Sequence, residues 1–353
     1  TVRPEPSVRE KTPRARRWLE GLGWGAPLPL MAAALLSGPA EGFGPREVLA
    51  WAAAALGAAP APAAEQAAVI AAVVLDVRLP RILLAFLAGA SLTVSGNALQ
   101  ALFRNPLVSP DILGLTAGAA FGAALALTAG GLPLQGSAFA FALAAVGLTY
   151  GIARQRGGAS TVALILSGVI VSGVFTALLT IVQFLADPFK LQTIVHWTLG
   201  NLHNASWAKV GSAALPMGLG WVGLWLMRWR MNVIALGDDE TRAVGLNPEK
   251  EKLLILVPAT LVASASVAVA GIIGMIGLAL PHVVRMAAGP DNRRTVPLSL
   301  GFGGGFLVLV DTFSRSTAAF ELPVGIFTTL LATPVFVYLL KTRFLPGTGR
   351  DVA

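Results

Sequence analysis

Runs of about 20 apolar residues recur from one end of the chain to the other, separated by short stretches that carry proline, glycine and charge. A helix of that length is what crosses the hydrocarbon core of a bilayer. The composition agrees, because only 12% of the 353 residues are charged, against about 25% in soluble domains. The sequence therefore predicts an all-α, polytopic membrane protein with about ten transmembrane helices.

The apolar runs divide the chain into an N-terminal arm at 1–22, a transmembrane domain at 23–343 and a C-terminal tail at 344–353. We expect the spans at residues 24–36, 79–101, 112–130, 134–153, 161–185, 209–229, 253–273, 278–289, 296–314 and 323–340. Placing both termini in the cytoplasm keeps most loop cations inside, as the positive-inside rule requires. The segment 37–77 then becomes an external connection with two alanine-rich helical patches.

Three arginines depart from this charge rule. Arg78, Arg81 and Arg315 fall on the outside, so they need a functional explanation. The net charge of +8 is otherwise accounted for by cytoplasmic loops. The cations are scattered between apolar runs, so we do not expect a nucleic-acid-binding face.

The segment from Arg78 to Gly122 holds two apolar helices joined by a tight polar link. Pro106 and Pro110 are four residues apart and cannot lie inside one helix without breaking its hydrogen bonds. Ser109 before Pro110 is typical of an N-cap, so we expect the second helix to begin there. Glycine recurs at every fourth position early in that helix, at 114, 118 and 122. One face of the helix then carries a strip without side chains, a smooth strip that predicts close packing against another helix.

The segment 228–252 is the longest charged interruption after the N-terminal arm. Within it, Asp238, Asp239 and Glu240 are typical of the first turn of a short helix, where the helix dipole stabilises negative charge. Gly245 then stops that helix. Two interpretations of this segment remain open. It is either an ordinary solvated loop or a protruding docking site for a soluble partner on the cytoplasmic face.

The sequence lacks the residues that several kinds of chemistry require. The chain has no cysteine, which excludes disulfides, zinc thiolates and iron–sulfur clusters. It has no G-x-x-x-x-G-K-[ST] motif, so we do not expect it to bind nucleotide phosphates itself. Its three histidines are too few to propose a Ser-His-Asp set. We therefore expect neither enzyme activity nor a cofactor in this chain.

Acidic and basic groups are scarce inside the predicted spans. Asp311 is the best candidate for a buried carboxylate, and such a group is either functional or stabilises the helices around it. His196 and His203 fit interfacial polar residues better than a metal site, and His282 fits a helix break after Pro281. A proton-driven carrier needs a chain of buried acids, so their scarcity favours energy supplied by another protein.

Several short motifs occur together between residues 75 and 343. They are Arg78-Leu79-Pro80-Arg81, Gln100-Ala101-Leu102-Phe103-Arg104-Asn105-Pro106-Leu107, Leu113-Gly114, Trp197 with Gly200, Leu236-Gly237 through Gly245-Leu246, Gly277-Leu278 with Pro281-His282, and Glu321-Leu322-Pro323-Val324-Gly325. Together they resemble the permease subunits of type II ABC importers, the family that handles iron-siderophore complexes, haem and cobalamin. The resemblance implies a homodimer in the bacterial inner membrane with the pathway on its two-fold axis. It also implies two ATPase subunits inside, which bind ATP and Mg²⁺, and one periplasmic binding protein outside.

The resemblance also gives roles to matching residues. Arg78, Arg81 and Arg315 resemble outer arginines that dock the binding protein. Ion pairs at the rim of such an interface set the orientation and the association rate of the partner. The alternative is that these arginines extend to lipid headgroups. Asn105 and Leu107 resemble the constriction that closes the pathway at the cytoplasmic side. The helices that couple to the ATPase are implied within residues 235–250, at Leu236, Gly237, Asp238, Asp239, Glu240, Ala243, Gly245 and Leu246.

A bulky apolar cargo needs a pathway wall of small, weakly polar side chains. The candidates are Ser91, Ser95, Asn97, Ser167 and Ser172. Ala117 and Met275 replace a serine and a phenylalanine that are common in the family, which affects packing rather than class. No residue selects among the cargoes, and the arm at 1–22 has no counterpart. An ion-driven secondary transporter and a non-transporting membrane scaffold remain as alternatives.

Overall fold

The structure, a computed structural model, describes residues 21, 23, 25–37, 43–60, 62–155, 158–317 and 322–339. The predicted N-terminal arm, apart from Gly21, and the predicted C-terminal tail lie outside these residues, as does Glu321 of the last motif. The described part is helical apart from turns, connecting loops and a hairpin of two short antiparallel strands, β1 (Arg154–Gln155) and β2 (Gly158–Ala159).

Each of the ten expected spans corresponds to one α-helix, with ends that differ by up to a few residues, which confirms the predicted all-α fold. These helices are α2 (Pro27–Leu36), α5 (Leu79–Phe103), α6 (Leu115–Ala129), α7 (Leu134–Ala153), α8 (Thr161–Leu185), α10 (Trp207–Ile234), α12 (Pro248–Ala270), α13 (Ile276–Ala288), α14 (Asn292–Thr317) and α15 (Val324–Leu339). In the described residues, 5 helices (α7, α8, α10, α12 and α14) are long and apolar enough to cross a bilayer, and α2, α6, α13 and α15 contain shorter apolar segments.

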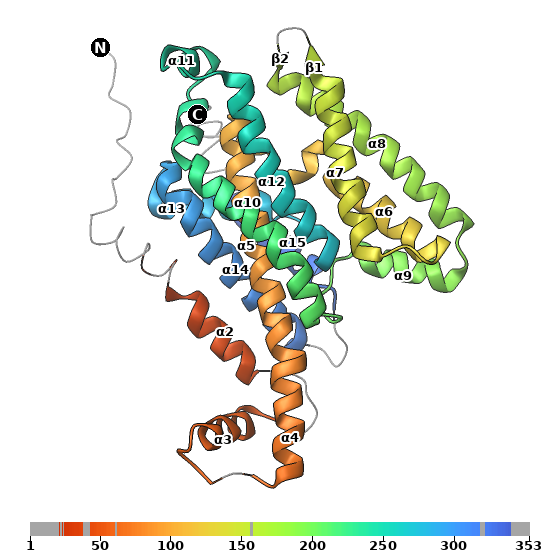
Figure 1. Cartoon of the computed structure of the whole chain (residues 1–353), viewed down its shortest axis with the longest axis vertical. Helices are drawn as coiled ribbons and strands as arrows, with labels where there is room; N and C mark the ends of the chain where they lie inside the picture. The colour runs from red at the N-terminus through yellow and green to blue at the C-terminus, as the bar shows by residue number, and fades with distance from the viewer. Residues whose placement is uncertain are drawn as a thin grey trace, which may run out of the picture.

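Helix α5 is the centre of the bundle, and α10, α12, α13 and α14 pack around it (Figure 1). It is buried along most of its length. Its backbone touches its neighbours at glycines, because a Cβ on Gly89 would collide with the carbonyl of Gly303 on α14. Likewise, a Cβ on Gly96 would collide with the carbonyl of Gly277. Such close approach favours helix association where no hydrophobic effect acts between helices.

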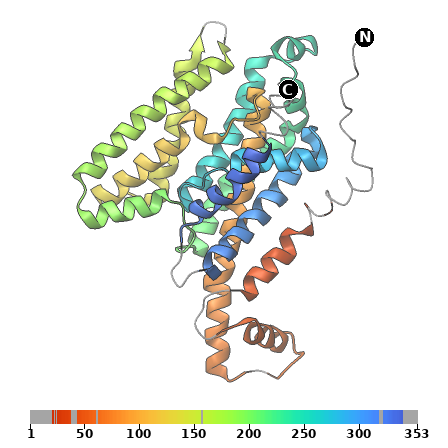
Figure 2. The ribbon, with the colours of Figure 1, turned by 180° about the vertical axis from the view of Figure 1, so that it is seen from behind.

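Helices α6, α7 and α8 form a second group on one flank, together with α9 (Pro188–Thr198), as both views show (Figure 1, Figure 2). The predicted smooth strip lies between α6 and α7. A Cβ on Gly118 would collide with the carbonyl of Phe141, and one on Gly122 with the carbonyl of Ser137. The two helices therefore pack at the closest distance that their backbones allow.

The prediction that the α6 helix begins at Ser109 is wrong. Residues Pro110–Leu113 form a separate 3₁₀ turn, η2, and Gly114 follows with a φ of 79° before α6 begins at Leu115. Both Leu113 and Leu115 are fully buried. One continuous helix would point residues two positions apart to different faces, so the left-handed glycine between them lets both reach the core.

Helix α5 is continued beyond the bundle by α4 (Ala64–Ala72) and a π-helical turn, η1 (Val73–Arg78), at the end opposite the hairpin (Figure 1). Here α4, η1 and α5 follow one another without a break, and α3 (Pro45–Ala55) lies beside α4 (Figure 1). Pro80 cannot donate to the carbonyl four residues earlier, which accounts for a wider turn at this place. Both alanine-rich patches are thus helical, but the second continues a predicted span instead of standing apart from it.

Candidate functional site

Helix α11 (Asp238–Ala243) connects α10 to α12 at the same end of the bundle as the hairpin (Figure 1). Gly237 precedes it with a φ of 154°, and its carbonyl accepts a hydrogen bond from Thr241 Oγ1 at 2.5 Å. The helix is followed by Gly245, whose φ is 79° and whose N–H donates to the carbonyl of Arg242 at 2.9 Å. The predicted short helix, with acids in its first turn and a glycine after its last, is confirmed.

The α11 surface, residues 236–245, has apolar side chains at both edges and charges between them. Leu236 is 70% exposed and Val244 is 57% exposed. Asp239 and Glu240 are exposed as well, and Asp239 pairs with Arg242 at 2.8 Å within the helix. A protein partner that covers the apolar edges can also pair with the charges, so this composition favours a docking surface over an ordinary solvated loop.

Asp238, the first residue of α11, joins three elements. Its Oδ1 accepts from Arg104 Nη2 at 3.3 Å, and its Oδ2 accepts from Lys252 Nζ at 2.8 Å. Arg104 caps the C-terminus of α5 with a φ of 52°, and Lys252 is buried near the start of α12. One carboxylate between two cations therefore ties α11 to the ends of α5 and α12.

The same network reaches the hairpin. Lys252 Nζ lies 3.0 Å from Glu249 Oε1, and Glu249 Oε2 accepts from the backbone N–H of Ala159 at 2.8 Å. The sequence pattern does not predict Arg104 or Lys252 as part of the site. Arg104 lies in the motif at 100–107 and Lys252 in the charged segment, but only the fold brings Arg104 to an aspartate 134 positions away.

The loop after Arg104 holds the two residues that the resemblance places at the constriction. Asn105 Oδ1 accepts from the backbone N–H of Leu107 at 2.9 Å, which makes the turn tight. Leu107 is 47% exposed. The ion pair between Arg104 and Asp238 therefore anchors this loop at its beginning, while Leu107 lies at the surface. The constriction itself stays a prediction.

A second polar contact joins α10 to the start of α14 at this end. Asn232 Nδ2 donates to Asp291 Oδ1 at 2.7 Å, and Asn232 Oδ1 accepts from the N–H of Asn292 at 2.8 Å. Burial raises the pKa of Asp291, but hydrogen bonds from the N–H of Arg293 and from Asn232 outweigh burial and hold this pKa below its ordinary value. Asp291 is therefore a charged hydrogen-bond acceptor at neutral pH.

At the opposite end, Asp311 is buried between two of the outer arginines. Its carboxylate lies 2.9 Å from Arg81 Nη2 on α5 and 3.3 Å from Arg315 Nε on α14. The carboxylate is 1% exposed, and the arginines are 6% and 4% exposed. Of the two roles considered for Asp311, this geometry favours stabilisation of the helices around it.

Arg78, the third outer arginine, is 2% exposed. Its guanidinium donates to the carbonyl of Leu35 at 2.8 Å and to that of Phe43 at 3.1 Å, so it contacts both the end of α2 and the residues just before α3. All three outer arginines thus have acceptors inside the chain. Their docking to a binding protein stays a prediction, which requires at least one of these side chains to turn outward.

The structure does not bring the five pathway candidates together. Ser91, Ser95 and Asn97 are fully buried on α5, and each has a hydrogen bond to another helix of the same chain. On α8, Ser167 is buried and Ser172 is half-buried. Pathway lining stays a prediction, and a single chain gives it no support at the three α5 positions.

Comparison with known proteins agrees with this architecture. Residues 31–342 match the model of the FecCD transport family. The chain is similar to the cobalamin import system permease protein of Halobacterium salinarum, with 41% identity over 275 residues that cover 76% of this chain and 73% of the relative. It is also similar to the hemin transport system permease protein of Yersinia pestis, with 34% identity over 278 residues that cover 75% of this chain and 82% of the relative.

A solved structure shares the fold. An ABC transporter of the metal-chelate type in an inward-facing conformation matches with a TM-score of 0.79 and 30% identity, over 93% of this chain and 99% of the other. The family match includes both the α11 surface and Asp311. The chain therefore belongs to the FecCD transport family, as a multi-pass membrane permease with the type II ABC importer fold.

Proposed function

We propose that this chain is the transmembrane permease subunit of an ATP-driven importer that moves a bulky metal chelate from a periplasmic binding protein into the cytoplasm. The relatives named for cobalamin and hemin support a cargo of the iron-siderophore, haem or cobalamin kind. The observation that carries the proposal is the α11 surface, which is exposed to a partner and joined by Asp238 to the end of α5.

The working assembly places two copies of the permease on a two-fold axis in the bacterial inner membrane. Two ATPase subunits, with ATP and Mg²⁺, bind on the cytoplasmic side, and one binding protein docks on the periplasmic side. The α11 surface and both termini then lie in the cytoplasm. The chain itself takes no part in the chemistry of ATP, because its sequence has no phosphate-binding motif.

Coupling runs from α11 to the loop at the end of α5. An ATPase that moves α11 also moves Asp238, and with it Arg104 and Lys252, because these side chains are ion-paired. Arg104 is followed directly by Asn105 in the tight turn that presents Leu107. A displacement of α11 therefore changes the position of this turn and opens or closes the cytoplasmic constriction.

Charge reversal on the α11 surface tests this proposal. We expect Asp239→Lys combined with Glu240→Lys to remove the ATPase from the purified complex while the permease dimer stays intact, because both side chains are exposed and hold no other helix. The measurement is the amount of ATPase that co-purifies with the permease. Arg46→Glu on α3, an exposed charge reversal at the opposite end, is the matched control and keeps the ATPase. Full ATPase binding by the α11 variant contradicts the proposal.

The ion-driven alternative is tested by uptake into vesicles that contain no ATP. Among the described residues, the buried acids Asp311 and Glu251 are each paired with an arginine, at 2.9 Å to Arg81 and 2.7 Å to Arg230. Paired carboxylates of this kind are poor proton carriers, because protonation breaks the ion pair. We therefore expect no uptake when an ion gradient is the only source of energy.

A further inference from the structure

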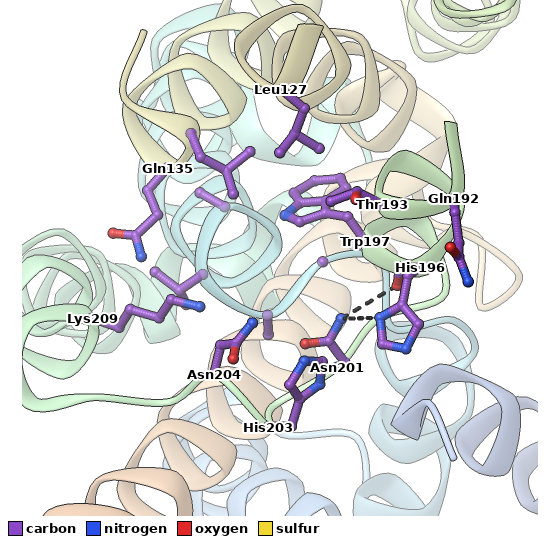
Figure 3. A pocket seen from close by; sticks show the side chains of 15 residues that line it. Leu127, Gln135, Gln192, Thr193, His196, Trp197, Asn201, His203, Asn204 and Lys209 are labelled. Carbon is purple, nitrogen blue, oxygen red and sulfur yellow. Dashed lines mark hydrogen bonds between the residues drawn. The ribbon is translucent and has the colours of Figure 1, made fainter. Parts of the chain in front are cut away.

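A pocket of about 300 Å³ lies at the end of the bundle opposite α11, between α9, the end of α6, the start of α7, the start of α10 and the end of α12 (Figure 3). Its floor is fixed by the backbone. The N–H of Asn201 donates to the carbonyl of Ala270 at 2.9 Å. Gly200 and Gly271 have φ values of 70° and 71°, and a Cβ on either one would collide with the facing backbone. The pocket is therefore preformed.

The polar groups around this pocket are rich in hydrogen-bond donors and include no carboxylate. Lys209, near the start of α10, is half-buried, and within the described residues no carboxylate oxygen lies within 4.0 Å of its ammonium group. Gln135 Oε1 accepts from Ser212 Oγ at 3.2 Å, which leaves its amide N–H groups for the pocket. Asn204 supplies a second amide beside Lys209 (Figure 3).

Trp197 gives the pocket a flat apolar wall. Part of the residue packs against the small buried cluster of Ala123, Ala138 and Ala268, which holds the indole in place. Its remaining surface lines the pocket together with Leu127 (Figure 3). An aromatic wall next to amide and ammonium donors is suited to a flat ring that carries a polar group.

We propose that this pocket binds a small organic anion, a carboxylate on a flat ring, with the carboxylate at Lys209, Gln135 and Asn204 and the ring against Trp197. The volume of about 300 Å³ lies at the lower limit of ligand pockets and holds one such ring, not a whole chelate. A metal cation is a poorer fit, because the described residues contain no group of three or more His, Cys, Asp or Glu side chains. The site does not depend on the proposed transport.

Benzoate and benzamide are the probes, because they share the ring and differ in charge. Binding to the purified permease in lipid nanodiscs is measured by calorimetry, with empty nanodiscs subtracted. We expect benzoate to bind at least tenfold more tightly than benzamide. Lys209→Gln is expected to remove this preference and Lys209→Arg to keep it. The matched control is Lys190→Gln on α9, a lysine outside the pocket, which is expected to leave the preference unchanged.

Trp197→Leu tests the wall separately, since it keeps an apolar side chain but removes the flat surface. We expect this variant to weaken both probes by the same factor while the preference for benzoate remains. Equal affinity for the two probes overturns the proposal. A preference that survives Lys209→Gln in a folded variant, checked by an unchanged melting temperature, overturns it as well.

Discussion

The carboxylate of Asp311 holds together two helices that are far apart in the sequence. It contacts Arg81, 230 positions away, and Arg315, one turn further along α14. The charge rule placed these arginines at the end opposite the charged segment 228–252, where they lie in the structure, but it could not show that they are buried, because neither hydropathy nor spacing reveals a partner at that separation. For the same reason, the sequence could not pair Arg104 with Asp238.

We predict that Asp311→Asn strongly destabilises the protein. The substitution removes a buried carboxylate that pairs with two guanidinium groups, and breaking a buried pair in this way costs about 3–5 kcal/mol. A fall in the melting temperature of the detergent-solubilised chain is the expected result. Asp76→Asn, at an exposed position of η1 at the same end, is the control and leaves the melting temperature unchanged. Equal melting temperatures for the two variants refute the structural role of Asp311.

We predict that Arg104→Gln and Asp238→Asn affect transport through the ion pair that these two residues share, while Asp238→Asn also removes the pair with Lys252. Each change removes the ion pair of 3.3 Å, so each reduces ATP-driven uptake, and the double variant is no worse than the more impaired single variant. Lys190→Gln breaks an exposed pair with Asp187 at the opposite end and serves as the control with normal uptake. Fully additive losses in the double variant show that Arg104 and Asp238 act separately.

Helices were easier to predict than the contacts between them. The predicted bounds of α7 and α8, at 134–153 and 161–185, agree with the structure because long apolar runs end at turn residues on both sides. The sequence did not reveal that α4 continues into α5 or that Gly114 separates η2 from α6. Both features depend on which side chains reach the core, and the length of an apolar run in the sequence does not show this.

We predict opposite effects for two glycine substitutions in the α6–α7 pair. Gly122→Ala places a methyl group against the carbonyl of Ser137 and should destabilise the protein by about 1–3 kcal/mol through overpacking. Gly147→Ala on α7 meets nothing within 4 Å and should be neutral or stabilising by up to about 1 kcal/mol, because alanine favours the helix. The measurement is the thermal unfolding of both variants. A Gly122→Ala variant that is as stable as Gly147→Ala contradicts the close packing of α6 and α7.

The whole molecule has two different ends joined by α5. The α11 end presents exposed charged and apolar side chains, and its ion pairs connect α11 to α5, α12 and the hairpin. The opposite end holds the buried group around Asp311 and the pocket beside Trp197. The exposed charges and the ion pairs of α11 are therefore separated from the buried ion pairs of Asp311 by the length of α5.

Uptake into proteoliposomes is the measurement that separates an ATP-driven permease from the alternatives. The vesicles contain the permease and its ATPase, and they receive the binding protein loaded with a radiolabelled metal chelate. We predict uptake only when ATP and Mg²⁺ are present on the ATPase side, and loss of that uptake in the variant with Asp239→Lys and Glu240→Lys. Uptake that continues without ATP, or that is normal in this variant, contradicts this prediction.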